Sequence, residues 1–119
     1  MAALALASVS GGACGMTEST REPIGCRVSG ADKALADAGG ARELCELIER
    51  AAKVQAPGLS FDVDVHAPTN YSLAAKIRLR DGRMLPDLNM AVSDRRIDRV
   101  SVEQFAAAIS DAAAKASRS

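Results

Sequence analysis

The chain has 119 residues, and its 15 basic and 15 acidic side chains give a formal net charge of zero. This length allows one domain, and the even charge argues against a nucleic-acid partner because duplex binders concentrate Lys and Arg on one face. Hydrophobic residues make up 48% of the chain but aromatic residues only 3%, so large side chains are scarce and a disulfide would contribute strongly to stability.

The first residues carry no charge and become poor in bulky side chains toward Cys14. This resembles the later part of a bacterial export signal without its basic opening, so either the start lies inside a longer signal or the interpretation is wrong. Ala5-Leu6-Ala7 fits an ordinary cleavage site, and Gly11-Gly12-Ala13-Cys14 resembles a lipobox in which Gly11 replaces the leading Leu, so Cys14 is a candidate lipidation site. An idle thiol on a frayed terminus is the alternative. We assign 1–22 to an export-signal-like leader and polar linker, and 23–119 to a single small domain.

Cys26 and Cys45 lie inside that domain, and we predict that they form a disulfide. Closing a loop of about 20 residues stabilises a fold by around 3 kcal/mol on the chain-entropy estimate. Two buried free thiols are the alternative. Because disulfides persist in oxidising compartments, we predict a location in the cell envelope, either periplasmic or lipid-anchored, with the cytoplasm as the alternative.

The domain begins with a segment, 31–38, that could form a short helical turn, and continues with a predicted helix at 41–54. Apolar residues recur there at the three- and four-residue spacing of one helix face, namely Leu44, Leu47, Ile48 and Ala51. Cys45 lies at the margin of this face, where it could reach an extended segment carrying Cys26. The prediction therefore allows a short extra strand near Cys26.

Strict alternation of apolar and polar residues then predicts three antiparallel strands at 59–67, 71–80 and 84–92. We expect Pro68-Thr69-Asn70 to form the first turn. Asp81-Gly82 is expected as a two-residue hairpin turn, because Asp-Gly tolerates the positive φ that both central positions need.

The predicted register pairs Phe61 with Ile77 across the first turn and Ile77 with Pro86 across the second. All apolar residues then share one face, and the proline marks the third strand as a sheet edge. On the polar face Ser72 lies opposite His66. A serine and a histidine without an oxyanion hole are not a catalytic triad, so we predict no catalytic residues and no cofactor. We also predict no metal site, because alternate residues on a flat strand, such as Asp62, Asp64 and His66, diverge along the surface.

The last element is a predicted helix with Ser101 as its N-cap and Val100 packed on Phe105 as a hydrophobic staple. Its apolar stripe covers the sheet. Because each element has one apolar side, the predicted fold class is α+β, a two-layer sandwich of helix, three-stranded antiparallel meander and helix.

This element order over 41–116 resembles the topology of the double-stranded-RNA-binding domain. That family opens its second helix with clustered lysines, whereas this chain has Ser101-Val102-Glu103-Gln104 there. We therefore assign no family. The resemblance implies a cytosolic nucleic-acid-binding adaptor, which stands as the alternative function.

Our leading hypothesis is a non-enzymatic binding or assembly module of the cell envelope, with an unknown protein partner and no nucleic acid. A partner strand would dock at the edge formed by Leu85, Pro86, Leu88 and Met90. Cys14 would supply a membrane tether. A small enzyme that uses the polar sheet face is the weakest alternative.

Overall fold

The computed structural model describes residues 24–93 and 95–118, so the predicted leader lies outside the described residues. The elements are β2 (Ile24–Ser29), the 3-10 turn η2 (Ala36–Ala38), α2 (Gly40–Gln55), β3 (Phe61–Thr69), β4 (Ser72–Leu79), β5 (Leu88–Ala91) and α3 (Arg99–Ser117).

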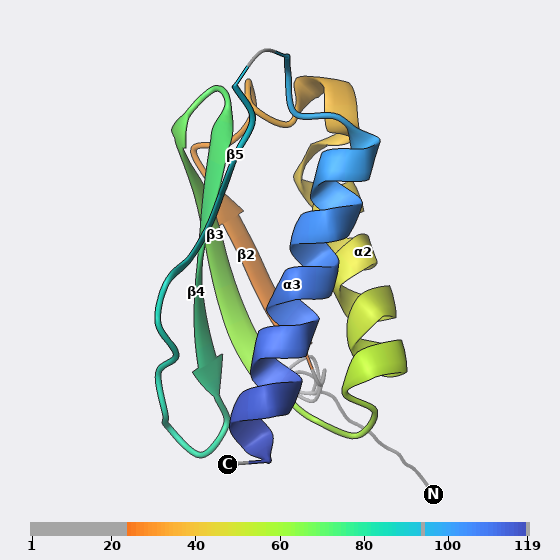
Figure 1. The fold of residues 1–119 in the computed structure, drawn as a ribbon, viewed down its shortest axis with the longest axis vertical. Coiled ribbons are helices and arrows are strands. Elements are labelled where there is room, and N and C mark those ends of the chain that lie inside the picture. Colours follow the sequence, from red (N-terminus) through yellow and green to blue (C-terminus); the bar gives the residue numbers. More distant parts are fainter. Residues whose placement is uncertain (1–23, 94, 119) are drawn as a thin grey trace, which may run out of the picture.

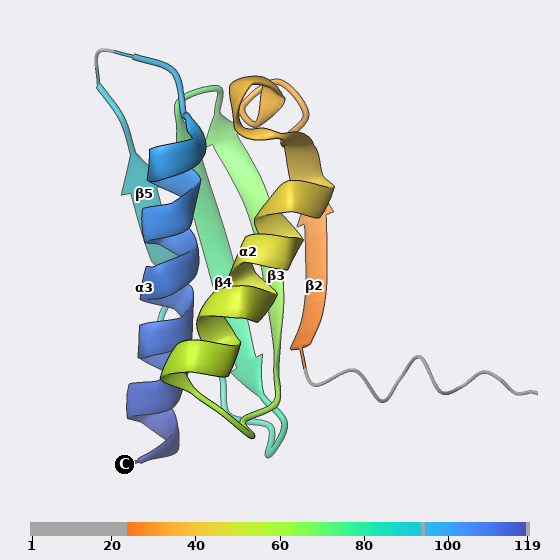
Figure 2. The same ribbon diagram turned by 90° about the vertical axis from the view of Figure 1, so that its right-hand side faces the viewer.

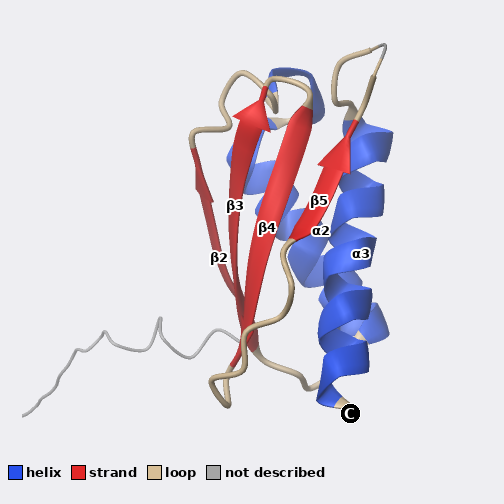
Figure 3. Ribbon diagram, turned by 60° about the vertical axis from the view of Figure 1, so that its left-hand side comes forward, coloured by secondary structure: helices blue, strands red, loops and turns tan. Residues whose placement is uncertain are grey.

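The strands form one four-stranded sheet in the order β2-β3-β4-β5. β2 runs parallel to β3, and the other pairs are antiparallel. Both helices lie on the same side of the sheet (Figures 1 and 2), and no helix of the described residues covers the opposite side (Figure 3). The predicted α+β two-layer sandwich is therefore confirmed.

The extra strand near Cys26 is also confirmed, as the six-residue edge strand β2. Its residues alternate, so that Ile24, Cys26 and Val28 pack toward the core. Parallel neighbours need a long crossover connection, which α2 supplies between β2 and β3. The parallel pairing was not anticipated from the sequence.

α2 extends one residue further at each end than the predicted helix. Gly39 precedes it with a φ of +97°, a left-handed conformation that glycine adopts without steric cost. The predicted apolar face is buried at Leu44, Leu47 and Ile48, whereas Ala51 is only partly buried and Ala52, which was not predicted, is buried.

The hairpin between β3 and β4 is shifted by two residues from the predicted register. Phe61 pairs with Leu79 rather than with Ile77, and the chain turns at Asn70-Tyr71 rather than in a three-residue turn. An irregularity in β3 just before this turn contains Pro68, as expected for a bulge, because proline has no N–H to contribute. A shift of two residues keeps every side chain on its predicted face.

The predicted two-residue turn at Asp81-Gly82 is wrong. The N–H of Gly82 donates to the carbonyl of Leu79, and the N–H of Leu79 donates to the carbonyl of Arg83, both at 2.9 Å. Gly82 has a φ of +100°. These bonds define a three-residue loop whose last residue is a left-handed glycine, the pattern of a type I turn with a G1 bulge.

The segment after this loop becomes a regular strand only at Leu88. The N–H of Leu85 donates to the carbonyl of Ile77 at 2.9 Å, whereas Leu88 pairs with Ala75 as predicted. Between these two points the edge segment has one residue more than β4, so the predicted pairing of Ile77 with Pro86 is wrong. The bulge around Pro86 shortens the predicted strand to the four residues of β5.

Asp98, not Ser101, is the N-cap of α3. Its Oδ1 accepts hydrogen bonds from the backbone N–H and the hydroxyl of Ser101, both at 2.9 Å. The predicted staple is also wrong, because the Val100 side chain points outward and is 57% exposed. Ile97 and Val102 occupy the staple positions instead, and both are fully buried.

The core fills the space between the sheet and the two helices. Most predicted inward positions of β3 and β4 are buried, but Ala74, predicted to face outward, is buried as well, and Tyr71, predicted to face inward, is half exposed in the turn. The largest fully buried side chains are Phe61, Leu35, Leu44, Ile48, Leu73, Ile77, Ile97 and Ile109. This single core holds the loops at both ends of the sandwich in place.

Candidate functional site

A disulfide joins the edge strand β2 to α2. The Sγ atoms of Cys26 and Cys45 are 2.05 Å apart and their Cα atoms 5.8 Å apart, a normal Cα spacing for a disulfide. Cys26 pairs with Val63 in the parallel register and so faces the helices. The predicted pair is confirmed, and neither sulfur is a free nucleophile. The predicted lipidation site, Cys14, lies outside the described residues.

β5 forms one edge of the sheet, as predicted. The N–H of Val92 donates to the carbonyl of Tyr71 at 2.9 Å. Because bonded and non-bonded pairs alternate in an antiparallel ladder, Met90 also bonds to β4, while Asn89 and Ala91 direct their backbone groups away from it. Both are exposed. Within residues 24–93 and 95–118, no strand pairs with this outer side of β5.

The four residues predicted to dock a partner fall into two groups. Leu85, Leu88 and Met90 are partly buried and pack against the core, whereas Pro86 is exposed in the bulge. A bulge and a proline both hinder strand addition, so the segment before β5 is a poor template. Pairing groups are therefore offered by the two exposed residues of β5 and not by the predicted residues themselves.

The open face of the sheet is polar, and its charges are paired. The Asp62 carboxylate lies 3.1 Å from Nη2 of Arg80 and 3.6 Å from Nη2 of Arg78. Gly25 is the parallel partner of Asp62, and a side chain at that position would collide with the carboxylate. These pairs make the face a balanced surface rather than one of a single sign.

His66 also lies on this face, but it pairs with Ala74, so the predicted position opposite Ser72 is wrong. The Ser72 hydroxyl instead lies 2.9 Å from Oγ1 of Thr69. Among the described residues, no group of three or more His, Cys, Asp or Glu side chains is placed to hold a metal ion.

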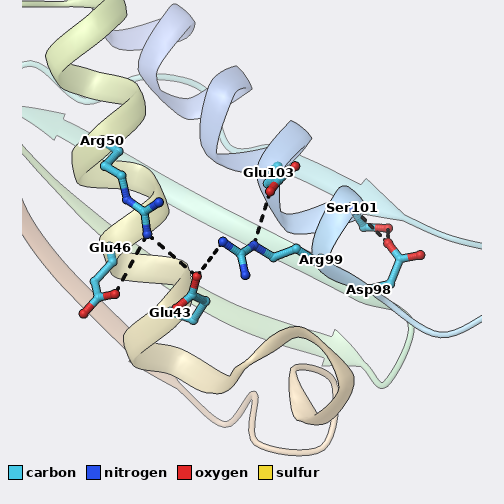
Figure 4. Close-up of polar contacts among 7 residues, drawn as sticks. All are labelled: Glu43, Glu46, Arg50, Asp98, Arg99, Ser101 and Glu103. Carbon is cyan, nitrogen blue, oxygen red and sulfur yellow. Dashed lines mark hydrogen bonds and ion pairs between the residues drawn. The ribbon is translucent and has the colours of Figure 1, made fainter.

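A chain of ion pairs connects the two helices (Figure 4). Oε2 of Glu43 lies 2.8 Å from Nη2 of Arg99 and 3.8 Å from Nη2 of Arg50, and Nε of Arg99 lies 3.2 Å from Oε2 of Glu103. The Glu43 side chain is only 24% exposed, less than the side chains of its two partners, Arg50 and Arg99. The charges at the start of α3 are therefore balanced by acids.

A crevice of about 260 Å³ opens at the end of the sandwich where the parallel strands β2 and β3 finish. Three segments far apart in the sequence meet there: the loop after β2, the β3–β4 turn and the loop before α3 (Figure 1). The lining residues are Lys33, Ala34, Ala36, Asp37, Asn70, Tyr71 and Arg96.

The sequence analysis missed this crevice because each contributing segment is short and carries no motif. The nearest general rule comes from open α/β sheets, in which ligands bind in a crevice outside the carboxyl ends of the parallel strands. Applying the rule requires knowing that β2 and β3 are parallel, which the alternation pattern alone does not reveal.

No helix in residues 24–93 and 95–118 combines the length and hydropathy needed to cross a bilayer. Comparisons of the chain with models of protein families, with curated proteins and with solved structures found no match. The functional argument therefore depends on the geometry described above.

Proposed function

We propose that this protein is a non-enzymatic binding or assembly module of the cell envelope, which takes up a strand of a protein partner at β5. The observation that carries this proposal is the free edge at Asn89 and Ala91, whose exposed backbone groups have no partner strand among the described residues. An extended peptide adds to such an edge through main-chain hydrogen bonds.

The disulfide supports the envelope as the location, because bonds of this kind persist in oxidising compartments and are rare in the cytosol. Lipidation of Cys14 would tether the module to a membrane, whereas cleavage after Ala5-Leu6-Ala7 without lipidation would release it into the periplasm. The proposal as a non-enzymatic module is supported by the separation of His66 from Ser72 and by the bonded state of Cys26 and Cys45.

The alternative is a nucleic-acid-binding adaptor, and it receives less support. Arg96 and Arg99 lie near the start of α3, where the double-stranded-RNA-binding domain has its lysines. However, Arg96 is 3.4 Å from Asp37, and Arg99 is 2.8 Å from Glu43. Acids at these distances reduce the net attraction for phosphates, on which duplex binding depends.

The docking proposal is tested with a photo-reactive residue placed at Asn89 in the full chain, expressed in its native cell. We expect a discrete crosslinked adduct that disappears in the Ala91→Pro variant, which lacks one outward N–H. The matched control places the photo-reactive residue at Gln104, an exposed position on α3. An adduct that persists in the Ala91→Pro variant, or forms equally at Gln104, would contradict docking at β5.

The location is tested by the intact mass of the protein purified from its native cell. One spectrum reports cleavage of the leader, acylation of Cys14 and the loss of two hydrogens on forming the disulfide. An uncleaved and fully reduced chain would contradict the envelope proposal and leave the docking test unaffected.

A further inference from the structure

The crevice at the carboxyl ends of β2 and β3 has a lining that is mixed in chemistry. Lys33 and Arg96 are cationic, Asp37 and Asn70 supply oxygen acceptors, and Tyr71, a residue that is 51% exposed, supplies an aromatic ring. Pockets for small molecules combine apolar surface with a few convergent polar groups in this way, and the volume of about 260 Å³ is just below their usual range of about 300–1,000 Å³, which favours a ligand of a single ring.

The net charge of this lining is positive. Arg96 Nη1 lies 3.4 Å from Oδ2 of Asp37, so these two charges balance. Lys33 has no ion-pair partner among residues 24–93 and 95–118, and its charge is left over. An anionic group is therefore favoured in the crevice over a cationic one.

The frame of the crevice is held in place without a ligand. Oγ1 of Thr69 accepts a hydrogen bond from the N–H of Tyr71 at 3.1 Å, and the carbonyl of Tyr71 accepts one from Val92 at 2.9 Å. On the opposite wall, Leu35 is fully buried and its carbonyl accepts the N–H of Ala38 at 3.0 Å. A preformed frame lowers the ordering cost of binding a small ligand.

We propose that this crevice binds an acidic sugar unit, that is, a sugar ring carrying a carboxylate. The aromatic ring of Tyr71 would pack on the C–H face of the sugar, and Asn70 and Asp37 would accept hydrogen bonds from its hydroxyl groups. Lys33 would pair with the carboxylate. This ligand uses every type of group in the lining, whereas a bare anion would leave the ring and the acceptors unused.

The test is a titration of the ¹⁵N-labelled full chain, with its disulfide intact, followed through amide chemical shifts. The probes are glucuronic acid, glucose as the neutral ring, and acetate as the anion without a ring. We expect glucuronic acid to give saturable shifts at 33–37, 70–72 and 96, with a Kd below about 10 mM. Glucose and acetate should each bind at least about threefold more weakly.

Variants that change the charge of the lining test whether the crevice prefers an anionic ligand. Lys33→Met should weaken the binding of glucuronic acid about threefold or more. Asp37→Asn should strengthen it, because Asp37 is the one acid among the described lining residues and the amide that replaces it keeps an acceptor oxygen without the negative charge. The matched control is Lys53→Met, an exposed lysine on α2 outside the crevice, and it should bind like the wild type.

No saturable shift with glucuronic acid would overturn the proposal, as would equal binding of glucose or acetate. Weaker binding by the Asp37→Asn variant would overturn it as well. Because Lys33 and Asp37 are exposed, Lys33 in the loop after β2 and Asp37 in η2, these variants are expected to fold. Lys33 and Asp37 lie outside β5, so their variants should leave the crosslink at Asn89 unchanged, and this proposal and the docking proposal fail independently.

Discussion

At the scale of single residues, Ser110 is the least satisfied side chain of the core. It is fully buried in α3, and its hydroxyl has no hydrogen-bond partner among the described residues. A buried polar group without a partner costs about 1–3 kcal/mol, so we expect Ser110→Ala to raise the free energy of unfolding by roughly 1 kcal/mol in urea denaturation. Ser101→Ala is the matched control, because the buried Ser101 hydroxyl donates to Asp98 and its removal should destabilise the protein.

Asp98 gives the fold a dependence on pH. Its pKa lies below the ordinary value of 3.8, mainly because the backbone N–H of Ser101 donates to the carboxylate and secondly because the Ser101 hydroxyl does. A carboxyl with a lowered pKa stabilises the fold above its unfolded-state pKa, and that contribution is lost as the pH falls through the folded-state value. We therefore expect a smaller drop in Tm between about pH 5 and about pH 3 for Asp98→Asn than for the wild type. Equal drops would contradict this role.

The N-cap of α3 could not be predicted from the local sequence alone. Both Asp98 and Ser101 are good N-cap residues, and both are followed by an apolar periodic stretch. The structure selects Asp98 because Ile97 then enters the core as the staple residue, while Val100 stays outside. Burial in the tertiary fold, rather than local preference, decides between two acceptable caps.

At the scale of elements, the free edge of β5 makes a prediction that separates two neighbouring residues. The N–H of Met90 is directed at β4 and that of Ala91 away from it. We expect Met90→Pro to lower the free energy of unfolding by about 2 kcal/mol or more, and Ala91→Pro to change it much less. Urea denaturation measures both, and Met90→Ala isolates the loss of the side chain. Similar losses of unfolding free energy for the two proline variants would contradict the assignment that the Met90 N–H points toward β4 and the Ala91 N–H away from it.

The sequence predicts the helices and strands well, and their pairing less well. Alternation places Phe61 and Ile77 on the same face, and the structure confirms this. It does not distinguish registers that differ by two residues, because both bury the same side chains. The positions of Pro68 and Gly82 decide the register through a bulge and a left-handed turn, and several turn types accept these residues.

At the scale of the whole molecule, the disulfide compensates for a core that is poor in aromatic residues. It closes a sequence separation of 19 residues between β2 and α2, which corresponds to about 3 kcal/mol on the chain-entropy estimate. We expect Cys45→Ser to lower the Tm of the oxidised protein. A reducing agent should lower the wild-type Tm to the same value and leave that of the variant unchanged, and a wild type insensitive to reduction would contradict this contribution.

The sequence predicts some of the candidate sites and misses others, as it does for the fold. The disulfide and the edge position of the third strand could be predicted, because cysteine spacing and Pro86 are local signals. The crevice could not, because it exists only where Lys33, Tyr71 and Arg96 are brought together by a parallel pair of strands and a returning loop. Its residues are adjacent in space but are separated by long stretches of sequence.

The direction of β2 determines which end of the molecule would face outward if the protein were attached through the residues before this strand. The described chain begins at Ile24, at one end of this strand, and the crevice lies beyond the other end, past Ser29. α3 finishes at the same end as Ile24 (Figure 1). A support that holds the protein through the residues before Ile24 would therefore leave the crevice pointing outward, about 20 Å above the attachment point.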